Sequence, residues 1–322
     1  MLLLTLTLAS LCSEPALGAE SPAPLPPVRT WLESGRPAES IDVLVVGDGY
    51  VAADLVEDGP YWRDLERFSS RLLGELPFRS FRERFNIRAS TLTSEESGCD
   101  PSPFRNAVNT ALESYFDSSS GRVLKFRNAT LLTELVRGTG EIDIVFVMVN
   151  TDRYGGSGSV LPDLLVRGRP CPAPVFAAGN ADGIQIALHE LGHSFAGLTD
   201  EYADPPLQRR YRLPWKRDIR HPNATRKGQF DASSREALRG SLKWSHFLDL
   251  PGAESYSWLH EGAYYREEDC FRPWETCMMR SSRDPFCPVC CEQMARNLTE
   301  ACGDLWDPAQ YHLDHPLSLW AR

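Results

Sequence analysis

Short apolar runs alternate with segments of helical spacing over the first two thirds of the chain. Each apolar run has the length of a strand, whereas the longer segments carry apolar residues at every third or fourth position. The predicted strands cover residues 41–46, 85–93 and 142–150. The predicted helices cover residues 52–76, 104–116 and 184–196. This alternation predicts a fold with both helices and sheets, and we expect the α+β class.

The first residues of the chain predict export. Residues 1–12 (MLLLTLTLASLC) form an apolar run too short to cross a bilayer of about 30 Å, but of the length found in the core of a secretory signal. Small residues as far as Ala19 offer a cleavage point, so we predict a signal peptide over residues 1–19, although the usual basic start is missing. No other stretch reaches about 18 consecutive apolar residues. We therefore expect a secreted or extracytoplasmic protein with no membrane span.

The net charge excludes some partners. The chain carries 34 Lys and Arg against 44 Asp and Glu, which gives a formal net charge of -10. Because the surface would repel phosphates and has no Lys/Arg block, we expect neither nucleic acid nor an anionic membrane as a partner. The sequence does not determine the oligomeric state.

The cysteines suggest disulfides. The chain has nine cysteines, and loss of the signal peptide would remove Cys12 and leave eight, six of them between residues 270 and 302. An even set in an exported chain predicts bridges worth about 2–4 kcal/mol each, with Cys99 pairing with Cys171 by exclusion. Cys287 and Cys290 form a CxxC that could instead be half of a zinc knuckle or a redox pair. Because no second CxxC accompanies it, we favour structural disulfides.

An early glycine motif resembles a dinucleotide-binding turn. Residues 43–52 read as a strand followed by GxGxxA. However, Asp48 lies between the glycines, where its carboxylate would face a pyrophosphate, and no acidic residue ends a second strand about 20 residues later. We interpret the motif as a tight strand-to-helix turn.

The strongest chemical signal is an HExxH motif on the predicted helix at residues 184–196. His189 and His193 are four residues apart and therefore lie on one helical face, where both rings can bind the same cation. Glu190 follows the first histidine and can take a proton from a water bound to that cation. A metal lowers the pKa of such a water to about 7 and polarises a carbonyl, so a single carboxylate suffices as the base.

HExxH also occurs by chance on surface helices. Here apolar residues surround the motif and predict a buried helix. Two histidines and a glutamate are unusual in such a helix unless they bind something. In addition, Gly197 permits the left-handed turn that ends a helix, and an acidic pair follows where a third ligand would have to lie. We therefore predict a bound Zn²⁺.

The wider segment HELGHSFAGLTDEY (residues 189–202) resembles the signature HExxHxxxGLxDEY of the immunoglobulin-A (IgA) peptidase family of zinc metallopeptidases. The resemblance runs from about residue 41 to 295. Further similar blocks, in the family's order, are Gly47–Tyr50, Pro77-Phe78 with Phe85-Asn86, Asn150 with Tyr154–Gly158, Glu261–Ala263, Arg272-Pro273 and Cys277–Arg280. The resemblance implies a metzincin-like peptidase domain preceded by a smaller α/β region, and a protein or peptide substrate. It does not imply that immunoglobulin is the substrate.

Changes in composition, together with this resemblance, suggest how the chain is divided. Residues 20–40 are rich in Pro and Ser and predict an extended lead-in. The remaining segments are an N-terminal α/β region at 41–140, a zinc metallopeptidase region with a Cys-rich C-terminal part at 141–305, and a tail at 306–322.

Asp200 and Glu201 compete as the third metal ligand. In the metzincin pattern HExxHxxGxxH the third ligand lies three residues after the glycine, and this chain has one residue inserted before Gly197. Counting from the glycine, which fixes where the chain turns back, selects Asp200. We predict a zinc site of His189, His193 and Asp200, with Glu201 acting behind it.

Other residues carry weaker signals. Met279 resembles the methionine beneath the zinc of metzincin-like sites, although a core methionine is the alternative. Candidate hydrogen-bond donors to an oxyanion are Tyr202, His246, Tyr264, Tyr265 and Arg280. We expect ordinary structural or surface roles for His221, His260, His312 and His315.

Two functions remain. The first is a secreted zinc endopeptidase that hydrolyses peptide bonds by a metal-activated water, with Glu190 as general base. The second is a surface binding domain with a structural or vestigial zinc site. Because a non-catalytic zinc module has no need of Glu190, the sequence favours the peptidase.

Overall fold

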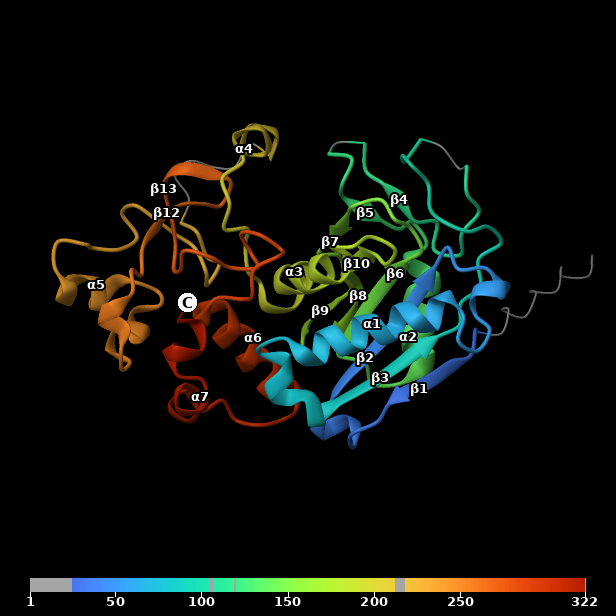
Figure 1. Cartoon of the computed structure of the whole chain (residues 1–322), viewed down its shortest axis with the longest axis horizontal. Coiled ribbons are helices and arrows are strands. Elements are labelled where there is room, and N and C mark those ends of the chain that lie inside the picture. Colours follow the sequence, from blue (N-terminus) through green and yellow to red (C-terminus); the bar gives the residue numbers. More distant parts are fainter. Residues whose placement is uncertain (1–24, 105–106, 119, 212–217, 322) are drawn as a thin grey trace, which may run out of the picture.

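The computed structural model describes residues 25–104, 107–118, 120–211 and 218–321. Its centre is a six-stranded sheet in the order β1-β3-β2-β6-β10-β7 (Figure 1). The neighbours β3, β2, β6 and β10 are parallel, and β1 and β7 are antiparallel to the strands beside them. The strands of this sheet are β1 (Val28–Leu32), β2 (Ile41–Asp48), β3 (Phe85–Ser90), β6 (Ile144–Val149), β7 (Gly156–Ser157) and β10 (Val175–Ala177).

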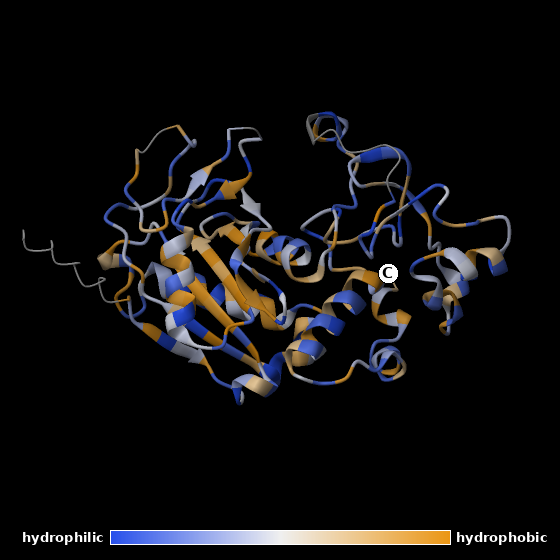
Figure 2. Cartoon of the chain, turned by 180° about the vertical axis from the view of Figure 1, so that it is seen from behind, coloured by the Kyte–Doolittle hydropathy of each residue, from blue (hydrophilic) through white to orange (hydrophobic). Residues whose placement is uncertain are grey.

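Helices cover both faces of the sheet, because alternate residues of the buried strands point to opposite sides. In β2, Val43 and Val45 pack on the side of α1 (Pro60–Gly74) and α3 (Gly183–Ala196). Leu44 and Val46 pack on the side of α2 (Ala129–Thr139). Figure 2 shows the strands as an apolar centre between helices of mixed polarity. The mixture of helices and sheets agrees with the predicted α+β class.

The C-terminal part continues the core around α3. It contains α4 (Pro205–Tyr211), α5 (Arg235–Ser241), α6 (Pro288–Ala301), α7 (Pro308–Asp314) and a three-stranded sheet, β11 (Thr225–Arg226), β13 (Arg266–Arg272) and β12 (His260–Ala263). Two small sheets complete the fold, β4 (Tyr115–Phe116) with β5 (Leu124–Lys125), and β8 (Val160–Val166) with β9 (Arg169–Pro172). Leu191 of α3 and Met294 of α6 belong to one continuous core, so α3 lies between the large sheet and the C-terminal part (Figure 1).

The three predicted strands and the helix that carries HExxH are present. The helix predicted over residues 52–76 is shorter and begins at Pro60, after a 3-10 turn at Ala52–Asp54. The lead-in at residues 20–40 contains β1, which the sequence analysis missed, and residues 1–24 of the predicted signal and lead-in lie outside the described residues. The central sheet includes strands from both sides of residue 140, so the boundary expected there does not separate two sheets.

The helix predicted over residues 104–116 is wrong. The described part of this segment is mostly irregular, with β4 at its end. The cause is Asp48, a fully buried carboxylate that accepts hydrogen bonds from the backbone N–H groups of Leu112 at 2.8 Å and Ser114 at 3.1 Å. These backbone donors are bound by a side chain from another part of the chain and are not available to a helix.

The predicted disulfides are absent from the structure. All eight cysteines of the described chain are free thiols, seven of them buried and Cys99 half-buried. Cys171 packs into the core on the α2 side of the sheet. Without disulfides, the C-terminal part is held against the rest of the protein by the hydrophobic core that the two share. Within the part of the chain that is described, no helix is long and apolar enough to span a bilayer.

Candidate metal centre

Helix α3 delivers the two histidines of HExxH to one point. A tight turn follows the helix, because Gly197 adopts a left-handed conformation with φ of 64° and donates its N–H to the carbonyl of Gly192. Nε2 of His189 and Nε2 of His193 lie 3.2 Å apart. The chain then returns beneath the helix and brings Asp200 to the pair.

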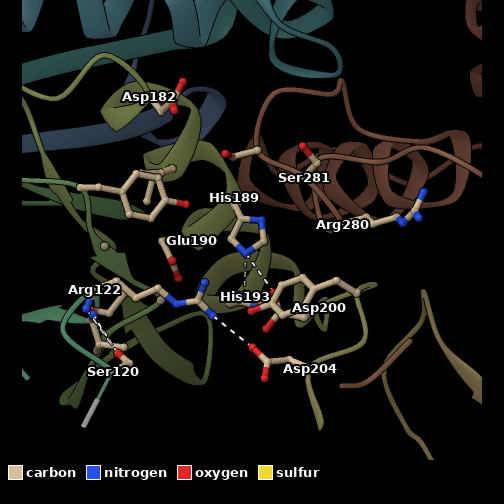
Figure 3. A pocket seen from close by; sticks show the side chains of 18 of the residues that line it. Ser120, Arg122, Asp182, His189, Glu190, His193, Asp200, Asp204, Arg280 and Ser281 are labelled. Atoms are coloured by element: carbon tan, nitrogen blue, oxygen red, sulfur yellow. Dashed lines mark hydrogen bonds and ion pairs between the residues drawn. The ribbon is translucent and has the colours of Figure 1, made fainter. Parts of the chain in front are cut away.

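Asp200, and not Glu201, reaches the histidines. Its Oδ1 lies 3.1 Å from Nε2 of His189 and 3.4 Å from Nε2 of His193 (Figure 3). These three side chains form a group whose ligand atoms could hold a metal ion. Burial opposes ionisation of Asp200, but the two histidines outweigh it and hold the pKa of this carboxyl well below its usual value.

The ring tautomers leave both Nε2 atoms available. Nδ1 of His189 lies 2.8 Å from the carbonyl oxygen of Met278, and Nδ1 of His193 lies 2.9 Å from that of Leu198. A carbonyl oxygen only accepts, so each Nδ1 carries the proton and donates it. Such a backbone bond on the far nitrogen orients a metal-binding imidazole.

The cluster attracts positive charge. Burial alone would lower the pKa of His193, but the nearby Asp200 carboxylate raises it to about 9. The same balance raises the pKa of His189. The carboxylate and the two rings therefore hold positive charge at this half-buried point, as protons on the rings or as a bound cation in their place.

Glu190 faces the same cavity as the histidines (Figure 3). It accepts a hydrogen bond from the backbone N–H of Gly158, while burial raises its pKa. Gly158 has to be small, because a Cβ there would lie 2.7 Å from Cβ of His193. Gly158 belongs to the glycine-rich block Tyr154–Gly158, but no pattern in the sequence indicated that it lies beside the histidines.

A cavity of about 650 Å³ opens over these residues. Its wall includes Arg122 and Asp204, whose side chains approach to 3.7 Å across it (Figure 3). Among the oxyanion candidates, Tyr202, Tyr265 and Arg280 line the cavity, whereas His246 and Tyr264 are not part of its wall. Arg122 comes from a loop far away in sequence, and no pattern in the sequence pointed to it.

Two tyrosines of the cavity wall hydrogen-bond to Asp200. The hydroxyl of Tyr265 donates to Oδ2 of Asp200, and Tyr202 also hydrogen-bonds this carboxylate. Burial, together with the charge of Asp200, raises the pKa of Tyr202 far above its usual value, so the phenol stays protonated and remains a donor.

Met279 lies directly against α3. It is fully buried, and a Cβ on Gly192 would approach its Sδ to 2.6 Å. The preceding residue, Met278, supplies the carbonyl that accepts from Nδ1 of His189, so this turn supports the helix that carries the two histidines.

Glu201 and His312 take part in other clusters. The Glu201 carboxylate points to Cys277, Cys287 and Cys290. His312 forms a half-exposed group with His246 and Glu292, in which Nε2 of His246 lies 2.8 Å from a Glu292 oxygen. Neither group could be recognised from the sequence, because the members of each are far apart along the chain.

Comparison with known families agrees with this site. Residues 30–251, more than two thirds of the chain, match the family described as IgA Peptidase M64. The chain belongs to this family and is a peptidase of the metallopeptidase class, which acts on proteins or peptides. No curated protein matches the chain.

Proposed function

We propose that the protein is an exported zinc-dependent endopeptidase with Glu190 as its general base. The observation that carries this proposal is the convergence of Nε2 of His189, Nε2 of His193 and Oδ1 of Asp200 within 3.4 Å of one another. The position of the group at the wall of a cavity, its backbone-oriented rings and the adjacent glutamate all favour a catalytic site.

Zinc suits this donor set better than the hard cations do. Ca²⁺ and Mg²⁺ prefer oxygen ligands, whereas two imidazoles and one carboxylate suit Zn²⁺. Zinc bonds of roughly 2.0–2.1 Å to N and O in a tetrahedron separate the ligand atoms by about 3.3 Å. The observed separations are 3.1 to 3.4 Å. Three protein ligands also leave the fourth position open, as catalytic zinc sites do.

The residues of the chain have separate tasks in hydrolysis. When bound, zinc polarises the scissile carbonyl and lowers the pKa of water. Glu190 takes the proton of the attacking water and passes it to the leaving amine, while the N–H of Gly158 holds its carboxylate toward the cavity. Tyr265 and Tyr202 hold Asp200 in place.

We propose that the site is metzincin-like. Gly197 ends the helix, Asp200 takes the place of the third ligand after that glycine, and Met279 packs beneath the helix. The similarity is one of arrangement, with a carboxylate in place of a third histidine. Export rests on the apolar run at residues 1–12, and sequencing the N-terminus of the protein recovered outside the cell tests it.

Digestion of casein or gelatin with and without a chelator tests the activity. A peptidase of this kind loses activity in the chelator and regains it with Zn²⁺, and mapping the cleaved bonds then defines its specificity. A binding domain with a vestigial site would cleave neither protein at any zinc concentration, and that result would refute the proposal.

A further inference from the structure

A second group of ligand atoms lies beside the first, buried completely. Sγ of Cys277, Sγ of Cys287, Sγ of Cys290 and a carboxylate oxygen of Glu201 all lie within 4.8 Å of one another. Each of these residues is at most 1% exposed. Cys287 and Cys290 belong to the CxxC at the start of α6, and Cys277 directly precedes the turn at residues 278–280.

The carboxylate of Glu201 is not fully bonded within the described chain. Its Oε1 accepts hydrogen bonds from Nδ2 of Asn223 at 2.9 Å and from Sγ of Cys290 at 3.2 Å, whereas its buried Oε2 has no partner there. A buried carboxylate with an unbonded oxygen is costly, and such groups are normally paired or bound to a metal.

Burial raises the pKa of Cys277 and of Cys290, but three features offset part of the cost of negative charge here. Cys287 is the N-cap residue of α6, where the helix dipole stabilises negative charge. Its backbone N–H lies 3.3 Å from Sγ of Cys277 and donates to it. Arg272 is buried close enough to act electrostatically on both Glu201 and Cys277. These features lower the cost of collecting negative ligands at one buried point.

We propose that Cys277, Cys287, Cys290 and Glu201 form a second, structural zinc site. Three sulfurs and one oxygen make a closed set of four ligands with no open position, as structural zinc sites have. A disulfide would join only two of the sulfurs and would leave the third thiol and the buried carboxylate unexplained. The Cys-rich segment therefore contains a metal site whose fourth ligand comes from the HExxH segment.

A second ion would stabilise the positions of two residues of the first site. Cys277 anchors the turn in which the Met278 carbonyl binds Nδ1 of His189. Glu201 anchors the residue after Asp200, and its backbone N–H donates to the Met279 carbonyl at 2.8 Å. The same four residues thus fix one histidine ring and the acidic ligand.

Metal analysis of purified variants tests the proposal without measuring activity. The wild type is expected to hold about two zinc ions per chain, and His189→Ala/His193→Ala about one. Adding Cys287→Ser/Cys290→Ser to that variant should remove the remaining zinc. Adding Cys291→Ser should leave it bound, because Cys291 is equally buried on the same helix but lies outside the group.

Cobalt replacement gives a second measurement if the cysteine variant fails to fold. Co²⁺ in His189→Ala/His193→Ala should show the intense thiolate-to-cobalt absorption of a tetrahedral sulfur site. A folded His189→Ala/His193→Ala protein that retains no zinc and lacks this absorption would overturn the proposal. So would a disulfide among the three cysteines in the unreduced wild type. Because zinc content, cobalt absorption and disulfide content are measured without peptide hydrolysis, neither result depends on the proposed peptidase activity.

Discussion

Asp200 and Glu201 are neighbours in the chain, yet their carboxylates serve different clusters. Oδ1 of Asp200 lies 3.1 Å from Nε2 of His189, and Oε1 of Glu201 lies 3.2 Å from Sγ of Cys290. The segment after Gly197 is irregular and not helical, so the side chains of two successive residues can point to different clusters. Asp200 therefore lies in the wall of the cavity, whereas the neighbouring Glu201 belongs to the buried cysteine cluster.

Glu190→Gln tests the general base. The amide keeps the shape of the side chain but cannot accept a proton, so we expect zinc content and fold to be retained while kcat falls about 100-fold or more. Casein digestion and metal analysis of the purified variant measure the two effects. Glu236→Gln, a change at an exposed position on α5, is the control and should leave both unchanged. Turnover above about a tenth of wild type would rule out this single-carboxylate mechanism.

Tyr265→Phe tests the support of Asp200. The change removes the hydroxyl that donates to Oδ2 of Asp200. Because this bond orients the carboxylate, we expect its loss to weaken metal binding by roughly 10- to 100-fold. The measurement is the zinc concentration that gives half-maximal activity in chelator-buffered solutions. Tyr264→Phe is a matched control, since Tyr264 shares the left-handed backbone but lies outside the cavity wall. Equal zinc dependence of the two variants would contradict the assigned role.

Features that depend only on the spacing of nearby residues could be predicted from the sequence. Strands such as β2 are apolar on both faces, and the spacing of His189 and His193 on one helix is independent of the rest of the fold. Asp200 followed from a count that begins at Gly197, a residue whose left-handed backbone fixes the turn.

The remaining features depend on contacts between distant segments. Apolar spacing predicted a helix at residues 104–116, but a buried carboxylate from β2 binds the backbone there. The CxxC at Cys287 lacked a second CxxC, and the structure instead brings Cys277 and Glu201 to it. Neither partner could be identified from spacing, because tertiary contacts such as the backbone hydrogen bond from Glu201 to Met279 bring these separate segments together.

Asp48→Ala tests the carboxylate that organises the loop beside the sheet. Asp48 accepts from the backbone N–H groups of Leu112 and Ser114 and from the hydroxyl of Thr110, all in the protein interior. Each buried donor left without a partner costs about 1–3 kcal/mol, so the free energy of unfolding should fall by roughly 3 kcal/mol or more. Urea denaturation measures this change. Asp163→Ala, at an exposed position of β8, should change the free energy by less than about 0.5 kcal/mol.

Gly183→Ala tests the start of the helix that carries the histidines. Gly183 is the first residue of α3 and is buried, and a Cβ there would lie 1.9 Å from the backbone carbonyl oxygen of Ala177. Ala177 belongs to β10 in the middle of the core, so its carbonyl cannot move aside without disturbing the sheet. Overpacking of this kind costs about 1–3 kcal/mol, and this should exceed any gain from the higher helix propensity of alanine.

Gly240→Ala is the comparison for that variant. Gly240 also lies in a helix, α5, but no atom outside its local backbone is within 4 Å of the position of an added Cβ. Alanine there should leave the free energy of unfolding unchanged or raise it by up to about 1 kcal/mol, because glycine loses more backbone entropy in a helix. Urea denaturation of both variants compares the two changes directly. If Gly183→Ala were as stable as Gly240→Ala, close contact between α3 and β10 could not be what fixes the position of the helix that carries His189 and His193.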